Sequence, residues 1–480
     1  MADSLKPLQE QDMPEGPERR AQETAVTVKQ VRSVCPKCLL PVMADLVIEK
    51  GRVVMRKECP RHGRFQALLS SDADMYLRSL PYNRPGRSPL GFSTQTKEGC
   101  PWDCGLCPDH KQHTCLALIE ITSRCNLNCP VCFADSGPGF DLSLAQVEKM
   151  LDRFVELEGN PEVVQFSGGE PTLHPDLVAM IDSARRRGIQ MIMVNTNGIR
   201  IAQDDAFLAK LSDVKPTVYL QFDGFSPESQ KVRGENLVSV KLRALDRMAQ
   251  AKLDVVLVPT VEKHSNHDQV GEIVKFGLKH PAVHGIAFQP VTYAGRLPTH
   301  DPMDRETIPD VIHGVAEQTG GLLVESDFVP VPCCHPTCRS ATYVYVDGDQ
   351  VIPLPRLVEV DKYLDYIVNR TLPEIRPDIL EALEGLWSAA SVPGSKSTVQ
   401  RFLTACCTLP FLGTAAQLRR RVFTIVVQEF GDAYTMDLDV LHKCCIGELI
   451  PDGRMIPFCA YNSLGYRQKI WSELASGAMK

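Results

Sequence analysis

The sequence of 480 residues contains no charge-poor apolar run long enough to cross a lipid bilayer. Its first thirty residues are polar and lack the apolar core of a signal peptide. We therefore expect a cytoplasmic protein, whose contact with a membrane is at most peripheral. Positive charge is also in deficit, because 52 Lys and Arg face 59 Asp and Glu and the net charge is −7. This balance argues against a protein that holds nucleic acid through its phosphates.

Disulfide bonds are not expected either, although the sequence contains 18 cysteines. Reducing compartments keep thiols free, so metal ligation is the first explanation for such a number. No cysteine occurs between Cys132 and Cys333. We expect this interval to fold without a metal, and the 44% hydrophobic content of the chain is that of a folded globular protein.

A repeating pattern of short apolar runs and amphipathic stretches covers this interval and the residues just before it. The apolar, β-branched runs are 116–122, 163–166, 190–194, 217–222, 254–259 and 285–290. Stretches between them, such as 144–157 and 175–187, have helical spacing. Strands that alternate with helices predict an α/β fold of parallel βαβ units, either a partial (β/α)6 barrel or a doubly wound sheet. In both folds, functional residues gather at the C-terminal ends of the strands.

Three cysteines directly follow the first predicted strand, as Cys125-x3-Cys129-x2-Cys132. Three thiolates can hold three corners of a [4Fe–4S] cluster and leave one iron open, although a zinc site short of one ligand or free thiols would have the same spacing. The second predicted strand ends in Gly168-Gly169-Glu170-Pro171. Glycines allow the backbone to approach a ligand closely, and a carboxylate can bind an amino group. Together the two motifs resemble the radical S-adenosylmethionine (SAM) superfamily.

This resemblance implies that the three cysteines bind a [4Fe–4S] cluster whose open iron is chelated by SAM. One electron then splits SAM into methionine and a 5′-deoxyadenosyl radical, which abstracts hydrogen from an unactivated carbon. In this superfamily Gly168, Gly169 and Glu170 would hold the methionyl amine. The remaining SAM-side and substrate-side positions implied by the resemblance are Asn197, Gln221, Asp223 and Ile286.

A separate metal knuckle is predicted near the N-terminus. Cys35-x2-Cys38, a short hairpin over 44–57 and Cys59-x2-His62 have the form of a rubredoxin-like or zinc-ribbon site. The metal is mononuclear zinc or iron, and spacing does not choose between them. Incidental thiols in a hairpin, or His62 as a bystander, are the alternatives.

Two auxiliary [4Fe–4S] clusters are predicted from the remaining cysteines. The first set repeats the C-x3-C-x2-C spacing and adds a fourth thiol, as Cys100, Cys104, Cys107 and Cys115. This trio would be the alternative SAM cluster, but it precedes the first strand rather than following it. The second set is distant in sequence and comprises Cys334, Cys338, Cys445 and Cys459. Cys406 and Cys407 lie in an apolar stretch, and we interpret them as packed thiols.

The whole arrangement of motifs, from about residue 34 to 462, resembles tetraether synthase and its relatives, some of which are described as radical SAM methyltransferases acting on a pterin. The resemblance implies joining of lipid chain ends by C–C bond formation, with a low-potential donor such as ferredoxin or flavodoxin. The apolar segment 402–418 and the basic residues 419–421 would face a lipid and its head-group, or else form a core helix with a basic cap. The alternatives are methylation or other modification of a pterin or small substrate, and a protein that only transfers electrons or scaffolds zinc, which would have no use for Gly168–Pro171.

Five regions follow from these motifs. They are a disordered tail at 1–30, the rubredoxin-like knuckle at 31–80, an auxiliary cluster segment at 81–115, the partial barrel at 116–320 and a C-terminal auxiliary-cluster and substrate domain, or lid, at 321–480.

Overall fold

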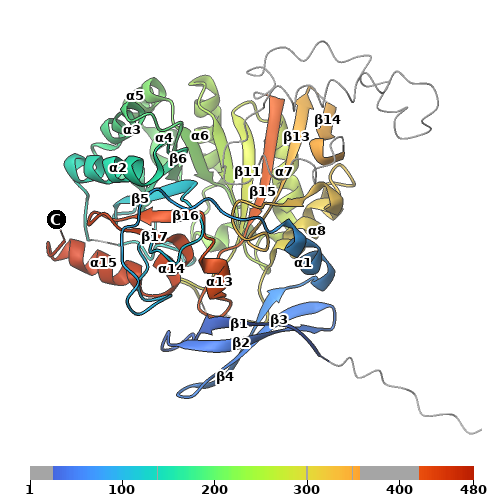
Figure 1. Ribbon diagram of the computed structural model, residues 1–480. Helices are drawn as coiled ribbons and strands as arrows, with labels where there is room; N and C mark the ends of the chain where they lie inside the picture. The colour runs from blue at the N-terminus through green and yellow to red at the C-terminus, as the bar shows by residue number, and fades with distance from the viewer. Residues whose placement is uncertain (1–24, 138, 299–300, 349, 357–420, 480) are drawn as a thin grey trace, which may run out of the picture.

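The computed structural model describes residues 25–137, 139–298, 301–348, 350–356 and 421–479 (Figure 1). Most of the predicted tail, and the segment 402–418 with Cys406, Cys407 and the first two of its three following arginines, lie outside the described residues. Arg421 is described, and its guanidinium lies 2.8 Å from the Asp347 carboxylate.

The N-terminal region is a four-stranded antiparallel sheet in the order β1-β2-β3-β4. Its strands are β1 (Val26–Val34), β2 (Pro41–Glu49), β3 (Arg52–Cys59) and β4 (Gly63–Ser70). The predicted tail at 1–30 is therefore wrong from Val26 onward, because β1 pairs with β2 and buries Val31. The predicted hairpin over 44–57 is confirmed, and its turn lies at Lys50 and Gly51, which both have the positive φ of a two-residue turn. Helix α1 (Ala73–Ser79) follows.

Six parallel strands form the centre of a much larger sheet. They are β5 (Leu116–Thr122), β6 (Val163–Gly168), β7 (Met191–Thr196), β8 (Thr217–Gln221), β9 (Val255–Val258) and β11 (Val283–Pro290). They neighbour one another in chain order, without the reversal that defines a doubly wound sheet. The partial (β/α)6 barrel is thus confirmed over the doubly wound alternative.

Helices cover the outer face of this sheet (Figure 1). They are α2 (Leu144–Glu158), α3 (Leu177–Arg186), α4 (Ile199–Gln203), α5 (Asp205–Val214), α6 (Val238–Gln250), α7 (Val270–Lys279) and α8 (Ile308–Gln318). Short 3-10 turns occur at Leu80–Tyr82, Pro171–Leu173, Glu228–Val232, His267–Gln269, Glu325–Asp327 and Leu354–Arg356. Ser143 caps α2 with a capping box, which explains why the predicted stretch 144–157 starts where it does.

The C-terminal region extends the same sheet at both edges. β15 (Val422–Gln428) pairs parallel to β11, and β16 (Ile446–Leu449) pairs parallel to β5. The outer strands are β12 (Val329–Pro330), β13 (Arg339–Asp347), β14 (Gln350–Pro353) and β17 (Met455–Pro457), with β10 (Thr260–Val261) on β11. Helices α13 (Leu438–Leu441), α14 (Phe458–Ser463) and α15 (Tyr466–Ala475) complete the chain. Within the described residues, eight parallel strands therefore surround the barrel interior, not counting the two-residue β10, which also pairs parallel to β11.

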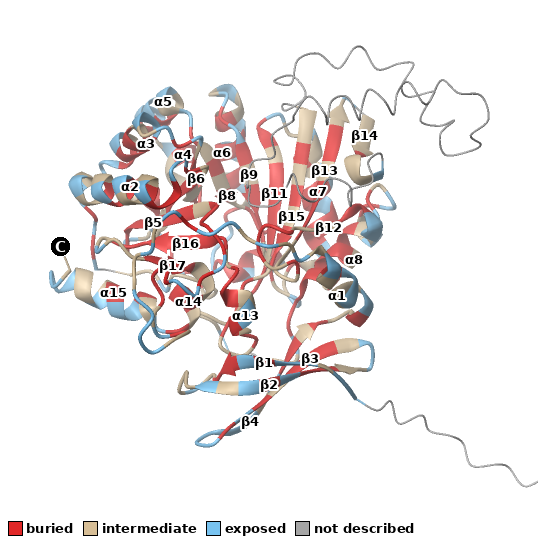
Figure 2. Ribbon diagram, in the orientation of Figure 1, coloured by how far each residue is buried: buried red, intermediate tan, exposed pale blue. Residues whose placement is uncertain are grey.

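The alternation of side chains along β5 decides what faces the interior. Ala117, Ile119 and Ile121 belong to the apolar core that includes the buried face of α2, whereas Leu118 and Glu120 line the interior. Figure 2 shows the strands of the barrel mostly buried and the outer surfaces of the helices exposed. Among the described helices, none combines the length and the apolar character that a membrane span requires.

Candidate functional site

A cavity of about 1450 Å³ occupies the barrel interior. It is lined by the inward faces of the strands and by the loop that follows β5, so the predicted gathering of functional residues at the C-terminal strand ends is observed there. Cys125, Cys129 and Cys132 all line this cavity. The structure thus brings together the three thiols predicted for the SAM cluster, in one partly enclosed place with a donor set of sulfur alone, which suits an iron–sulfur cluster.

Gly168 and Gly169 pack closely against the loop after β5 that carries Cys125, Cys129 and Cys132, which is called the cysteine loop below. A Cβ on Gly168, whose φ is +120°, would lie 2.2 Å from the Thr122 carbonyl oxygen, and one on Gly169 would lie 2.2 Å from that of Arg124. Gly169 and Glu170 donate backbone hydrogen bonds of 2.8 Å to these same two oxygens. The glycines also line the cavity, but the structure shows that the backbone they approach most closely is that of the loop leading to Cys125.

Glu170, which follows β6, forms hydrogen bonds with residues at the end of β7. Its buried carboxylate accepts hydrogen bonds from the Thr172 and Thr196 hydroxyls, at 2.6 and 2.7 Å, and from the Asn197 backbone amide at 2.8 Å. Burial raises the pKa of Glu170, and these hydrogen bonds oppose the shift. The carboxylate therefore has a structural use in this arrangement, and its binding of a methionyl amine stays a prediction.

Asp223 lies behind the cavity wall rather than on it. Its carboxylate is fully buried and forms two hydrogen bonds of 2.7 Å with Arg233, whose guanidinium does line the cavity. Burial alone would raise the pKa of Asp223, but the charge and hydrogen bonds of Arg233, the charge of Lys241 and the Thr260 amide together hold that pKa below its usual value. Lys241 lies 3.9 Å from Asp223, and burial lowers its pKa to about 8. Asp223 thus positions Arg233 beside Cys129.

The other predicted SAM-side positions, Asn197, Gln221 and Ile286, all line the cavity. Asn197 donates through Nδ2 to Asn126 Oδ1 at 2.7 Å, which ties it to the cysteine loop. Gln221 Oε1 is buried and has no hydrogen-bond partner among the described residues. A buried amide oxygen without a partner favours the binding of a ligand that carries a hydrogen-bond donor.

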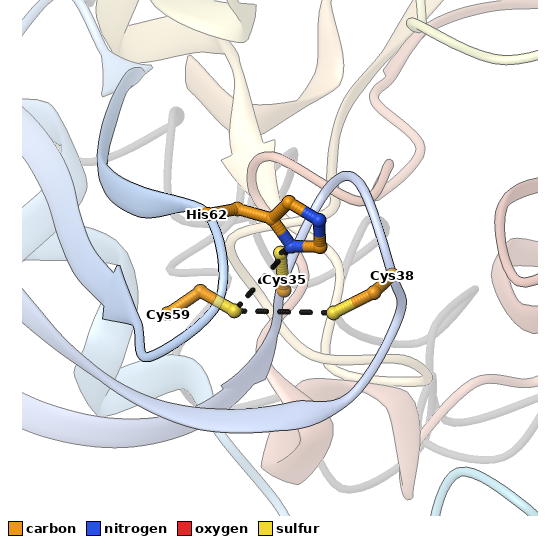
Figure 3. Close-up of side chains that lie close together, drawn as sticks. All are labelled: Cys35, Cys38, Cys59 and His62. Atoms are coloured by element: carbon orange, nitrogen blue, oxygen red, sulfur yellow. Dashed lines mark hydrogen bonds between the residues drawn. The ribbon is translucent and has the colours of Figure 1, made fainter.

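The predicted metal knuckle closes as expected (Figure 3). The four ligand atoms of Cys35, Cys38, Cys59 and His62 lie within 4.8 Å of one another. His62 Nδ1 is 3.6 Å from both Cys35 Sγ and Cys59 Sγ, and Cys38 Sγ is 3.9 Å from Cys59 Sγ. Ligand bonds of about 2.0 to 2.3 Å in a tetrahedron require separations of this size, so the site fits a single zinc or iron ion with His62 as a ligand.

Replacing Cys59 with Ser is expected to remove one metal ion per chain and to unfold the four-stranded sheet well below the unfolding temperature of the barrel. The sheet is small, and structural metal binding contributes directly to the folding of such units. Metal analysis and limited proteolysis of the sheet measure the two effects. Arg61→Ala, an exposed neighbour of the same turn, is the control; an unchanged metal content in Cys59→Ser would contradict the site.

The cysteines predicted for the first auxiliary cluster do not stay together. Cys115 Sγ lies 2.9 Å from Cys333 Sγ, and these two sulfurs form a compact group with that of Cys445. The reason is strand pairing: Cys115 precedes β5, Cys445 precedes its parallel neighbour β16, and the Cys115 amide donates to the Cys445 carbonyl. The grouping of Cys115 with Cys100, Cys104 and Cys107 is therefore corrected.

The cysteines predicted for the second auxiliary cluster belong to one enlarged group. Cys334, Cys338, Cys445 and Cys459 pack together, and the group also contains Cys115, Cys333 and Cys444, three thiols that the prediction left out of it. A second cavity of about 700 Å³ lies against Cys334, Cys338, Cys444, Cys445 and Cys459. This concentration of thiols is consistent with iron–sulfur ligation, with more sulfurs than one cluster needs.

Cys100, Cys104 and Cys107 lie near one another, and Cys100 and Cys104 pack in a cluster that Cys444 and Cys459 also contact. A hydrogen bond from Cys104 and the neighbouring His442 lower the pKa of Cys100 to about 6. A low thiol pKa favours the thiolate that ligates metals. The prediction placed Cys115 next to Cys100, but in the structure His442 is a neighbour of Cys100.

Several charged residues of the cavity were missed by the sequence analysis. They are Glu120, Arg233, Arg339, Glu448 and Arg467. Glu120 was recognisable, because alternation along the predicted strand 116–122 puts it on the interior face. Arg233 follows a 3-10 turn, Arg339 and Arg467 lie at the beginnings of β13 and α15, and Glu448 lies on a strand of four residues. At such positions no periodicity indicates the direction of a side chain.

Comparisons with known proteins agree with this geometry. Residues 119–277 match the radical SAM superfamily, and residues 27–71 match the N-terminal zinc ribbon domain of the HMPTM type. The chain is 35% identical to the 7,8-dihydro-6-hydroxymethylpterin dimethyltransferase of Methanocaldococcus jannaschii, over 92% of this chain and 94% of that protein. This protein belongs to the radical SAM superfamily, in the family of that enzyme.

Other radical SAM proteins match over a smaller part of this chain. The GTP 3′,8-cyclase of Haemophilus influenzae is 29% identical over 34% of this chain and 49% of its own length. The crystal structure of Streptococcus suis SuiB bound to S-adenosylmethionine covers 44% of this chain and 48% of its own, with 15% identity and a TM-score of 0.37. The superfamily match and the relative of 35% identity show a radical SAM enzyme, which implies a [4Fe–4S] cluster and SAM, and the zinc ribbon match agrees with the predicted metal knuckle.

Proposed function

We propose that this radical SAM enzyme modifies a reduced pterin, most simply by methyl transfer. The observation that carries the proposal is the identity of 35% with the M. jannaschii enzyme, because it extends over nearly the whole of both chains. The aligned region therefore extends well beyond the barrel. Joining of lipid chains, expected first from the sequence, has less support, and no relative named above is called a lipid enzyme.

The residues of the cavity suit this chemistry. Cys125, Cys129 and Cys132 would hold the cluster, which together with SAM supplies a 5′-deoxyadenosyl radical when it receives one electron. That electron would come from a low-potential donor such as ferredoxin or flavodoxin. Arg233, held rigidly by Asp223, offers positive charge for a carboxylate of SAM beside the cysteine loop.

Polar side chains on the inward faces also favour a heterocyclic substrate. Gln165, Asn195, Tyr219 and Glu448 all line the cavity and offer hydrogen-bonding groups, some without partners within the described part of the chain. A pterin has several ring nitrogens, an exocyclic amine and a carbonyl to satisfy such groups, whereas an alkyl chain has none. Burying unpartnered polar groups against a hydrocarbon is costly.

Lipid joining remains the second candidate because of one observation. The cavity extends from the cysteine loop along the strands to Gln190, Lys215 and Lys252 near their opposite ends. Its volume of about 1450 Å³ exceeds the usual range of about 300 to 1000 Å³ for small-molecule sites. An elongated substrate would fill this length.

Deuterium transfer to 5′-deoxyadenosine distinguishes the two candidates. Anaerobically reconstituted protein is incubated with SAM, reductant and 7,8-dihydro-6-hydroxymethylpterin deuterated at its carbon positions, and in parallel with a deuterated ether lipid. We expect deuterated 5′-deoxyadenosine from the pterin reaction only. A methylated pterin is expected when a methyl donor is also supplied, either a second equivalent of SAM or a one-carbon donor, because the SAM that is cleaved leaves as methionine with its own methyl group. Deuterium from the lipid alone would overturn the proposal in favour of lipid joining, and deuterium from neither would refute both.

A further inference from the structure

Glu448 is a buried carboxyl group at the wall of the barrel cavity. Glu448 lies on β16 and pairs with Leu118 of the parallel strand β5. Only 1% of its surface is exposed to solvent. It lines the cavity, yet neither of its oxygens has a hydrogen-bond partner among the described residues. Buried carboxyl groups without partners are rare because desolvation is costly, so such a group at a ligand cavity indicates a ligand that satisfies it.

The neighbouring carboxylate of Glu120, in contrast, has several hydrogen-bond partners. It accepts hydrogen bonds from Tyr461 Oη at 2.6 Å and Trp471 Nε1 at 2.7 Å, and it is paired with the Arg467 guanidinium. Arg467 also donates to the Phe133 carbonyl of the cysteine loop at 2.6 Å. Arg467 is therefore paired with Glu120. Glu448 has no ion pair within the described residues.

These surroundings favour the neutral acid form of Glu448. Burial raises its pKa well above the usual range, the charge of Glu120 raises it further, and Arg467 opposes the shift only in part. A neutral carboxyl group presents one hydrogen-bond donor and one acceptor side by side. The complementary ligand edge is a ring nitrogen with a lone pair next to an exocyclic amine, as in an aminopyrimidine.

We propose that Glu448 binds the 2-amino edge of the substrate heterocycle through two hydrogen bonds, donating from its hydroxyl to a ring nitrogen and accepting from the amine. The inference rests on the proposed function, because a reduced pterin carries this edge and a lipid chain does not. It adds to that function the residue that selects the substrate and orients the ring in the cavity. The step involves no transfer of protons or electrons.

The test compares two substitutions of Glu448 in the reconstituted holoenzyme with SAM and without reductant. The probe is 6-hydroxymethylpterin, whose fluorescence reports binding. Glu448→Gln keeps one donor and one acceptor, so its affinity should stay within about 3-fold of the wild type. Glu448→Met keeps the size but neither hydrogen bond, and its affinity should fall about 30-fold. Glu306→Gln, which changes a buried glutamate that binds His267 outside the cavity, should leave the affinity unchanged.

Iron content and SAM binding show whether each variant has kept the intact site. A second measurement needs no variant: a probe whose 2-amino nitrogen carries two methyl groups has lost its donor and should bind the wild type at least about 10-fold more weakly.

Equal affinity of this probe and the parent, or wild-type affinity in Glu448→Met, would overturn the inference while the proposed function stood. An equal loss in Glu448→Gln and Glu448→Met would overturn the pairing with a neutral acid. Failure of the wild type to bind the pterin at all would refute the proposed function, and the inference with it.

Discussion

Replacing Cys125, Cys129 and Cys132 together with Ala is expected to remove about four irons per chain and to abolish SAM cleavage. The three thiols line the barrel cavity beside Gly168 and Gly169, and they follow β5 at the position where a radical SAM cluster belongs. Without them the cluster has no other ligands in this loop. The barrel should survive, because its apolar core lies between the strands and the outer helices.

Iron and sulfide analysis and the yield of 5′-deoxyadenosine measure this prediction. The matched control replaces another set of three cysteines, Cys115, Cys333 and Cys445, with Ala. These thiols meet at the junction of β5 and β16, so the control should also lose iron while retaining the cluster that binds SAM. If the first variant still cleaved SAM, the active cluster would belong to the group of Cys100, Cys104 and Cys107 instead.

The parallel barrel was predictable from the sequence because its strands are buried on both faces. The predicted strand 116–122 has the same limits as β5, and the other five predicted runs overlap β6, β7, β8, β9 and β11. Continuous β-branched runs of this kind are typical of such strands. β15 and β16 were not predicted, because they are separated from the barrel in sequence and their pairing is a tertiary contact.

The metal sites were predictable only where their ligands are close in sequence. Cys35, Cys38, Cys59 and His62 belong to one sheet, and its short turns bring them together. Cys115 illustrates the limit. Its spacing suggested a fourth ligand for Cys100, but the pairing of β5 with β16 moves it to Cys333 and Cys445 instead.

Roles inside the cavity were the hardest to predict. The sequence placed Asp223 after its strand correctly, but the residue that reaches the cavity is its partner Arg233, ten positions later. Glu448 gave no signal because β16 has only four residues and follows two cysteines. Only the structure distinguishes a satisfied carboxylate from an unpartnered one, because hydrogen bonding depends on elements that are distant in sequence.

Replacing Arg233 with Met is expected to destabilise the protein by about 3 kcal/mol and to weaken SAM binding strongly. The substitution leaves the carboxylate of Asp223 fully buried without its two hydrogen bonds of 2.7 Å. Lys241, 3.9 Å away, retains part of the attraction, which places the loss at the lower end of the range for a broken buried pair.

The double variant Asp223→Asn and Arg233→Met separates stability from binding. Removing the buried carboxylate together with Arg233 should recover part of the lost free energy of unfolding, because Asp223 no longer leaves an uncompensated charge. The recovery is incomplete because the buried Lys241 loses its carboxylate partner. SAM affinity should stay low in both variants, because the cavity has lost its guanidinium beside Cys129. Arg247→Met, which breaks the exposed pair with Asp205, is the control and should cost at most about 1 kcal/mol. Denaturant unfolding and equilibrium SAM binding measure the two quantities, and recovery of SAM affinity in the double variant would show that Arg233 acts only through the packing of Asp223.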